Sequence, residues 1–240
     1  MYSIFKKEIH TFFGNATGYI VIGIFLLLTG LFLWVIPGEF NVLEAGYANV
    51  DGLFFLAPWL FLFLCPAVTM RAFAEEKQTG TWELLITKPI SEFQLVLGKY
   101  FAGWALVCLA LIPTVLYYVS VWFMAEPIGN VDAGAFWGSF IGLFFLSAVY
   151  VAIGTFASSL SKNQIVSFII ALVLCFFFYY GFDVIGSFFT SGETIYFINN
   201  LGIHAHYRSM SRGVIDSRDI VYFLVLTLIF IGATVWKIKK

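Results

Sequence analysis

The sequence predicts an all-α membrane protein with six transmembrane helices, and three observations support this prediction. Of the 240 residues, 61% are hydrophobic and only 11% are charged, which is too little charge for the surface of a soluble domain of this length. The 13 basic and 14 acidic side chains form short clusters that are separated by long uncharged runs. Six of these runs are long enough to cross about 30 Å of hydrocarbon as helices. The composition excludes disordered, collagen-like and nucleic-acid-binding proteins.

The six spans are expected at residues 19–36, 53–70, 100–125, 135–157, 165–185 and 220–236. The first span carries no charge and is rich in Leu, Ile, Val and Phe, so its insertion into a bilayer is strongly favoured. Its apolar core is too long, and begins too far from the N-terminus, for a cleaved signal peptide. We therefore expect it to remain in the mature protein, as part of one transmembrane domain over residues 1–240.

The basic residues between the spans predict the topology. Ten of them fall in the N-terminal segment and in every second segment after it, whereas Arg208, Arg212 and Arg218 share one long loop with acidic residues. Positive residues mark the cytoplasmic side of a membrane, so both termini are predicted to be cytoplasmic. Tyr and Trp residues at the ends of the spans agree with this topology.

Residues 1–18 are predicted to form an amphipathic helix that lies in the membrane interface. At 100° per residue its apolar side chains share one arc and its polar side chains share the opposite one: Tyr2, Phe5, Ile9, Phe12 and Phe13 against Ser3, Lys6, Lys7 and His10. Lys6 and Lys7 would then meet anionic head groups. An ordinary flank of the first span is the alternative.

The loop between the second and third spans, residues 71–99, contains clear helix-ending and helix-starting signals. Gly80 is placed to end a helix that continues from the second span, because glycine adopts the left-handed conformation without a Cβ penalty. Thr81 is placed to cap a short helix from Trp82 to Lys88, and Pro89 would end that helix.

The third span is predicted to begin at a capping box formed by Ser91 and Gln94, with Ile90 and Leu95 spaced as a hydrophobic staple. The short helix before it would then lie across the cytoplasmic surface. It would present Trp82, Leu85 and Ile86 along one side, with Glu83 pointing elsewhere, as in helices that dock into a groove on a partner. A solvated connector with its apolar side in the lipid interface fits the periodicity equally well.

Two motifs carry a family resemblance. The run R-x-F-x-x-E-K-x-x-G-T-x-E-L-L-x-T-K-P-I-S, from Arg71 to Ser91, resembles the cytoplasmic loop of ABC-2-type transporter permeases and follows the second of six helices, as in that family. The run from His206 to Asp219 is similar to the H-F-x-S-x-x-R-G-V-I-D-x-R-D pattern of the same permeases, with Tyr207 in place of the commoner Phe. Further stretches resemble the gliding-motility-associated branch of these permeases: Leu56–Trp59, Pro66–Arg71, Asn163–Ile165 and Cys175–Gly181.

The resemblance implies a half-transporter in the bacterial inner membrane, with no nucleic acid among its partners. A second permease copy or a related membrane subunit would pair with this chain within the lipid. Each copy would have an N-terminal interfacial helix, a coupling helix in the first inner loop, and short re-entrant helices in the outer segment, here residues 186–219. The chain lacks a G-x-x-x-x-G-K-[ST] motif, and its Gly98-Lys99 pair is followed by Tyr100. ATP and magnesium are therefore expected in a separate ABC ATPase subunit, with no cofactor and no enzymatic activity in this chain.

The implied function is a permease subunit that couples ATP hydrolysis by that ATPase to export across the inner membrane, in association with gliding motility. A membrane scaffold that uses the ATPase for assembly or mechanical work without moving a solute is the alternative. The residues expected to couple to the ATPase are Glu75, Glu76, Lys77, Thr79, Gly80, Thr81, Trp82, Glu83, Leu84 and Leu85. The outer motif contributes His206, Arg212, Gly213, Asp216, Arg218 and Asp219.

Few polar groups inside the spans suggest a site. Asp183, near the outer end of the fifth span, is expected to contact water or a local hydrogen-bond partner. His204 and His206 have a spacing that could hold a metal on an extended strand, but without an evident third ligand we expect an outer-surface loop. Paired catalytic groups at one depth, which an intramembrane enzyme needs, are not evident.

Small residues and prolines indicate how the spans pack. Gly134, Gly138 and Gly142 repeat at four residues on one face of the fourth span, which lets another helix approach closely, either within the chain or across a dimer seam. Prolines that remove backbone hydrogen bonds predict kinks in the second and third spans, at Pro58, Pro66 and Pro113.

Overall fold

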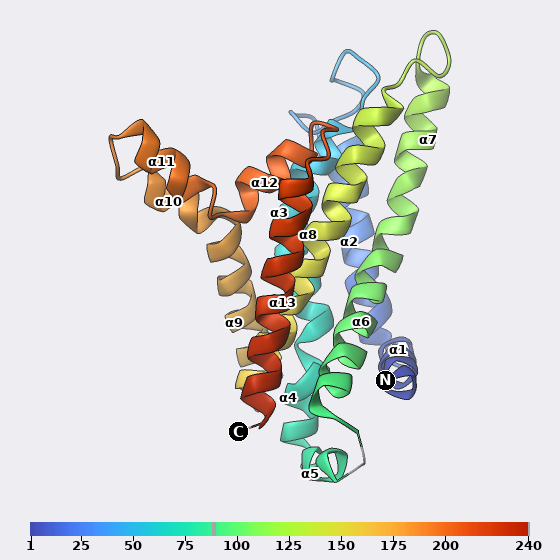
Figure 1. Ribbon diagram of the computed structural model, residues 1–240. Helices are drawn as coiled ribbons and strands as arrows, with labels where there is room; N and C mark the ends of the chain where they lie inside the picture. Colours follow the sequence, from blue (N-terminus) through green and yellow to red (C-terminus); the bar gives the residue numbers. More distant parts are fainter. Residues whose placement is uncertain (88–89, 240) are drawn as a thin grey trace.

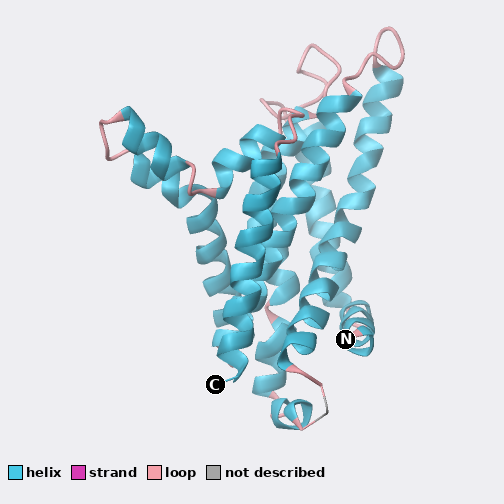
Figure 2. Ribbon diagram, in the orientation of Figure 1, coloured by secondary structure: helices cyan, strands magenta, loops and turns pink. Residues whose placement is uncertain are grey.

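The computed structural model describes residues 1–87 and 90–239, without the side chains of Leu84 and Ile86. Every regular element in this part of the chain is helical (Figure 2). Six helical segments are long and apolar enough to cross a membrane: Ala16–Trp34, Asp51–Gln78, Glu92–Met124, Ala133–Leu160, Gln164–Gly186 and Ser217–Lys239. The predicted all-α fold with six spans is confirmed.

Several spans are built from more than one helical piece. The second span joins α3 and α4, the third joins α6, η1 and α7, and the fifth joins α9, η2 and α10. The elements are α1 (Tyr2–Phe13), α2 (Ala16–Trp34), α3 (Asp51–Thr69), α4 (Arg71–Gln78), α5 (Trp82–Ile86), α6 (Glu92–Leu111), η1 (Ile112–Thr114), α7 (Val115–Met124), α8 (Ala133–Leu160), α9 (Gln164–Phe176), η2 (Phe177–Gly181), α10 (Phe182–Gly186), α11 (Gly192–Asn199), α12 (Ile203–Met210) and α13 (Ser217–Lys239).

The second and third spans extend further than hydropathy predicts. The second continues to Gln78 rather than 70, and the third begins at Glu92 rather than 100. Hydropathy underestimates both because the extra turns carry charged residues while the backbone stays helical. The predicted start of the third span is confirmed, since Ser91 Oγ accepts a hydrogen bond from the Gln94 N–H at 3.3 Å.

The prolines act differently in the two spans. Pro113 lies in the 3₁₀ turn η1 between α6 and α7, which is a distortion of the kind predicted. Helix α3, in contrast, continues through both Pro58 and Pro66.

Helix α8 forms the centre of the bundle and contacts α3, α9 and α13 extensively. It is the most buried span, with 72% of its most apolar stretch inside the protein, against 22% for the first span and 22% for the fifth, Gln164–Gly186. Its glycines allow this burial: a Cβ on Gly154 would lie 2.0 Å from Thr69 Oγ1, and a Cβ on Gly138 would lie 2.7 Å from the Cα of Gly213. The glycine repeat predicted in this span therefore serves packing within the chain at Gly138 and Gly142.

The two ends of the bundle carry different elements. The N-terminus, α5 and the C-terminal end of α13 lie at one end, whereas α10, α11 and α12 lie at the other, where α10 and α11 lean away from the bundle (Figure 1). Short helices α11 and α12 occupy the segment 186–219 for which short helices were predicted. The termini share one end because the number of spans is even, and this end is called the α5 end below.

Candidate functional site

The candidate site at the α5 end begins with the turn between α4 and α5. The N–H of Thr79 bonds to the carbonyl of Glu75 at 2.9 Å, and Gly80 follows with φ of +74°. The predicted helix end at Gly80 is confirmed, because only glycine adopts this conformation without strain. Helix α5 begins after Thr81, as predicted, but the Thr81 hydroxyl bonds to Thr79 Oγ1 at 2.9 Å instead of capping the helix. The predicted role of Thr81 as a side-chain cap is therefore wrong.

The apolar side of α5 faces the protein's own bundle. The Trp82 ring meets the Phe73 ring edge-on at 6.0 Å, and Lys77 Nζ lies 5.6 Å from the centroid of Trp82. Trp82 and Leu85 also line a cavity of about 320 Å³ together with Ile90 and the end of α13. Trp82 and Leu85 are thus half-buried against the chain's own bundle, and their docking to a partner stays a prediction.

The exposed groups of this segment are polar. Thr79, Gly80, Thr81 and Glu83 are all exposed at the tip that α5 forms. The short helix was predicted to reach Lys88, but α5 ends at Ile86, with Thr87 as the residue that follows it. The predicted stop at Pro89 and the side chain of Leu84 lie outside the described residues.

Helix α4 is anchored to α8 behind this tip. The hydroxyl of Ser158, on α8, accepts hydrogen bonds from the N–H groups of Phe73 and Ala74 at 2.9 and 3.2 Å, and donates to the carbonyl of Met70 at 2.9 Å. The N–H of Phe73 lies in the first turn of α4, where N–H groups lack partners within the helix. Lys77 Nζ donates to the carbonyl of Ser159, so both ends of α4 are bonded to the most buried span.

Four charged residues join α1, α4 and α6, and we call Lys7, Glu8, Glu76 and Lys99 the ion cluster. Lys99 Nζ lies 2.8 Å from Glu8 Oε1 and 2.9 Å from Glu76 Oε1, and Lys7 Nζ lies 2.9 Å from the same Glu76 oxygen. The Lys99 side chain is only 1% exposed and that of Glu76 is 10% exposed. Because burying a charge is costly unless it is paired, Lys99 fixes both carboxylates in place.

The ion cluster changes the expected roles of its members. Glu76, predicted as an ATPase contact, is turned inward, and its Oε2 is buried without a hydrogen-bond partner among the described residues. Lys7, predicted to face lipid, is partnered; burial lowers its pKa, but the hydrogen bond and charge of Glu76 outweigh this and leave the pKa raised above 10.5. Glu8 and Lys99 are functional candidates that the sequence reasoning missed, although a lysine beside an apolar span was a signal for Lys99.

The ion cluster holds α1 by one face. Ile4 is buried on that face, and a Cβ on Gly98 of α6 would lie 3.1 Å from Ile4 Cβ. Tyr2, predicted on the apolar arc, is 75% exposed. The predicted amphipathic helix is present over Tyr2–Phe13, but its buried face centres on Ile4, because the partner it meets is α6.

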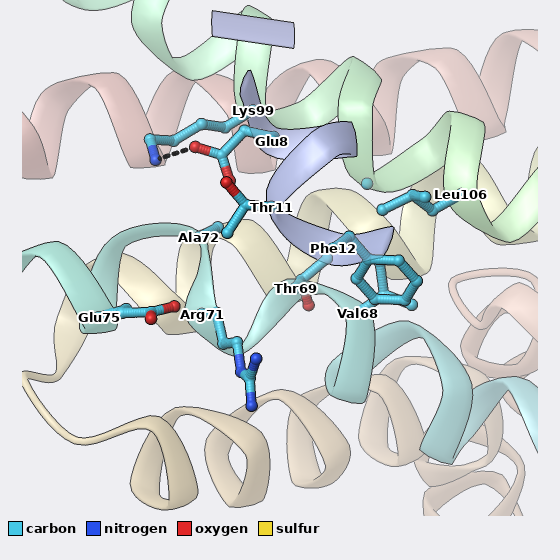
Figure 3. Close-up of a pocket in the computed structure, with 11 residues that line it drawn as sticks. Glu8, Thr11, Phe12, Val68, Thr69, Arg71, Ala72, Glu75, Lys99 and Leu106 are labelled. Atoms are coloured by element: carbon cyan, nitrogen blue, oxygen red, sulfur yellow. Dashed lines mark hydrogen bonds and ion pairs between the residues drawn. The ribbon is translucent and has the colours of Figure 1, made fainter. Parts of the chain in front are cut away.

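A small cavity of about 50 Å³ lies between α1, the α3–α4 junction and α6 (Figure 3). Glu75 and Arg71 line it from one side, with Glu8 and Lys99 on the other. Arg71 donates to Thr17 Oγ1 at 3.3 Å and so ties the start of α4 to α2. Glu75 is half-buried, which leaves part of its carboxylate open to solvent.

The outer motif at the opposite end is also built around charged groups. His206, on α12, bonds to Asp219 Oδ1 at 2.7 Å and to the carbonyl of Asn200 at 2.9 Å, while its ring stacks on Tyr222 at 3.9 Å. Asp219 is buried in the first turn of α13. This pair fixes α12 against the last span.

The remaining motif residues shape the turn before α13. Gly213 has φ of +80° and packs against α8, where its own Cβ would lie 2.7 Å from the Cα of Ala135. Asp216 Oδ1 accepts the N–H of Arg218 at 2.9 Å at the start of α13. The side chains of Arg212 and Arg218 are exposed.

Tyr207 has a role that its place in the motif did not reveal. Its hydroxyl is buried and donates to the carbonyl of Phe54 at 2.7 Å. That carbonyl would normally accept from the N–H four residues later, which is Pro58 and has none. Burial raises the pKa of Tyr207 well above its usual value, so the hydroxyl stays protonated as a donor.

The two histidines of the H-x-H spacing do not meet. His204 bonds to Asp183 Oδ2 at 2.5 Å, whereas His206 bonds to Asp219, because residues two apart on a helix point to opposite sides. Among the described residues, no group of three or more His, Cys, Asp or Glu could hold a metal ion. The pairing of Asp183 with His204 confirms the local hydrogen bond expected for this acid.

In a comparison with family models, residues 44–238 match the ABC-2 family transporter protein. The match covers most of the chain, including both motifs and five of the six spans. The chain belongs to this ABC-2 transporter family. A search of curated proteins finds none that matches. Membership identifies the chain as a multi-pass membrane component of an ABC transporter, in a family that generally works with an ABC ATPase subunit and whose membrane component is not itself catalytic.

Proposed function

We propose that this ABC-2 family protein is the permease subunit of an ATP-driven exporter in the bacterial inner membrane, with both termini cytoplasmic. The α4–α5 segment would take up the movement of a separate ABC ATPase. The observation that carries this proposal is the anchoring of α4: it is bonded to α8 at both ends and to α1 and α6 through the ion cluster, directly behind an exposed tip.

This anchoring supports a mechanical role. A push on α5 reaches α8 through Ser158 and Ser159, and reaches α1 and α6 through Glu76 and Lys99. Packed elements transmit such displacements as units, because interfaces and cores deform little. ATP hydrolysis, with its magnesium ion, would thereby bias the arrangement of the bundle without any nucleotide binding in this chain.

The expected coupling residues divide into two groups in this proposal. Thr79, Gly80, Thr81 and Glu83 form the surface that meets the ATPase, with Leu84 assigned to it from the sequence pattern alone. Glu75, Glu76, Lys77, Trp82 and Leu85 stand behind it and hold the tip on the bundle. Charged side chains at the rim of an interface mainly set specificity and association rate, which suits Glu83.

Site-specific photocrosslinking tests the proposal. A photoreactive residue replaces Thr81 at the tip, and a matched control replaces Glu126, which is also exposed and follows shortly after α7, whose C-terminal end lies opposite α5 (Figure 1). We expect Thr81 to capture a protein that carries a P-loop and binds ATP, identified by mass spectrometry, and Glu126 to capture none. Capture of the ATPase from Glu126, or labelling of Thr81 from outside the cell, would contradict the proposed coupling surface.

Membrane partners complete the proposal. A second permease copy or a related membrane subunit would cover part of α2 and α9, the two least buried spans, with lipid around the remainder. Native mass spectrometry of the complex gives the number of permease copies directly. ATP-dependent solute movement in vesicles would separate export from the scaffold alternative.

An association with gliding motility is the most specific part of the proposal, and sequence resemblance alone supports it. Deletion of the gene in a gliding bacterium should abolish movement over surfaces while growth continues. Normal gliding after deletion would remove this part and leave the transporter assignment intact.

A further inference from the structure

A pocket of about 640 Å³ lies between α11 and α12, at the end of the bundle opposite α5. Its polar lining comes from Asn199, Asn200, Arg208, Ser209 and Arg212, and Tyr196 stands at its edge. The two arginines are four residues apart, one at the end of α12 and one in the turn that follows. Both therefore extend from neighbouring positions into one pocket.

The charge in this pocket is uncompensated. In the described part of the chain, neither Arg208 nor Arg212 has an ion pair or a side-chain hydrogen bond, and none of the residues lining the pocket is acidic. Both side chains are exposed, so their charges remain available to a ligand.

Three nearby carboxylates are bonded to other groups. Asp183 is bonded to His204, Asp219 to His206, and Asp216 to the backbone at the start of α13. Glu193 follows Gly192 at the pocket edge but is exposed and does not line it. Asp183, Asp216 and Asp219 are thus held by other groups, and two arginines face one cavity.

We propose that this pocket binds a phosphate-bearing anion. Two guanidinium groups offer planar pairs of N–H donors that match phosphate oxygens, and they keep their charge at all physiological pH values. Asn199, Asn200 and Ser209, whose side chains carry neutral donors, also line the pocket. The lining is therefore complementary to an anion in both charge and hydrogen bonding.

Helix α11, which lines the pocket, and the turn before it carry exposed aromatic residues. Phe188 is 80% exposed, Tyr196 is 72% exposed and Phe197 is 66% exposed. Exposed aromatic side chains beside arginines are typical of the head-group level of a bilayer. The phosphate can therefore belong to a lipid head group or to a soluble phosphate compound, and both sources share this chemistry.

The test uses the full-length protein with the subunits that copurify, reconstituted in nanodiscs of phosphatidylcholine. One arm titrates inorganic phosphate by calorimetry. The second arm adds phosphatidylglycerol to the discs and counts retained anionic lipids by native mass spectrometry. Binding in the first arm alone identifies a soluble phosphate ligand, and retention in the second identifies a lipid head group. Binding in neither arm overturns the proposal.

Variants assign the binding to the pocket. Changing Arg208→Gln and Arg212→Gln together should weaken phosphate binding or lipid retention by about tenfold or more, because charge-assisted hydrogen bonds are lost. Arg218→Gln is the matched control, an exposed arginine on the same segment that does not line the pocket.

The paired Lys substitutions at 208 and 212 should retain part of the binding, since charge remains while the forked geometry is lost. An unchanged unfolding temperature verifies the fold of each variant. Equal loss in the Arg218→Gln control, or full binding by the double Gln variant, would overturn the assignment.

Discussion

The four residues of the ion cluster at the α5 end bind one another across distant parts of the chain, whereas at the opposite end two acids pair with histidines and two arginines face a pocket. In the ion cluster, Lys99 joins Glu8 and Glu76, which lie 91 and 23 residues away in sequence. At the opposite end, Asp183 and Asp219 each pair with a histidine of α12, while Arg208 and Arg212 face a pocket. The charges of the ion cluster are paired with one another, whereas the charges of the two arginines remain available to a ligand.

This difference indicates what each end can do. Buried opposite charges fix the geometry of three helices, because moving any one of them would leave a charge unpaired in a dry environment. Such an arrangement suits the transmission of movement from an attached motor. The arginines of α12 and of the turn after it are exposed, so they have lost little hydration and are available to a ligand, which suits recognition.

The strongest test of the ion cluster is the substitution Lys99→Met. The substitution preserves an unbranched side chain but leaves Glu8 and Glu76 without their buried partner, so we expect the free energy of unfolding to fall by about 3 kcal/mol or more. Equilibrium unfolding in mixed micelles measures the change. Combining Lys99→Met with Glu76→Gln should restore part of the loss, and a double variant no better than the single one would contradict the assigned pairing.

At the opposite end, Gly138→Ala tests the joint between α8 and the outer motif. The added Cβ would lie 2.7 Å from the backbone of Gly213, which cannot move aside as a side chain can, so a loss of about 2 kcal/mol is expected. Gly232→Ala on α13 is the control, because nothing lies within 4 Å of its added Cβ. Similar stability of both variants would show that the contact between Gly138 and Gly213 accommodates the added methyl group.

A smaller effect is expected from Tyr207→Phe, which restores the residue commoner in this motif. The carbonyl of Phe54 would lose its donor while Pro58 still offers none, at a cost of about 1 kcal/mol in unfolding free energy. Adding Pro58→Ala supplies the missing N–H, so Tyr207→Phe should cost less in that background. The double-mutant cycle measures this coupling. If the effects of the two substitutions on the free energy of unfolding simply add, Tyr207 does not compensate for Pro58.

The sequence predicted what depends on periodicity and local chemistry. Six apolar runs gave the spans, and Gly80 and Ser91 marked the end of α4 and the start of α6, because a left-handed turn and an N-cap each need particular residues. Hydropathy did not predict the charged helical turns of α4 and α6, because it reflects how apolar the residues are and not whether the backbone is helical.

What the sequence did not predict depends on partners brought together by the fold. The contact with α6 determines which face of α1 is buried, so Ile4 is buried and Tyr2 is exposed. Periodicity correctly separated Trp82 from Glu83 on α5, but could not tell whether the apolar side meets a partner protein or the chain's own bundle. The pairing of Glu8 with Lys99 had no local signal at all, since it joins two segments 91 residues apart.

The smallest effect is expected at the rim of the ion cluster, where Lys7 is 56% exposed. Lys7→Met should cost only about 0.5 kcal/mol, because solvent screens an exposed pair. The raised pKa of Lys7 means that its contribution is fully present below pH 10.5 and is lost as the pH rises through the higher value of the folded state. Unfolding temperatures of the wild type and Lys7→Met should therefore differ by a constant amount from neutral pH to about pH 10 and converge above it. A loss of stability as large as that of Lys99→Met would contradict the weak contribution expected for Lys7. Convergence of the two unfolding temperatures near neutral pH would contradict the pairing of Lys7 with Glu76.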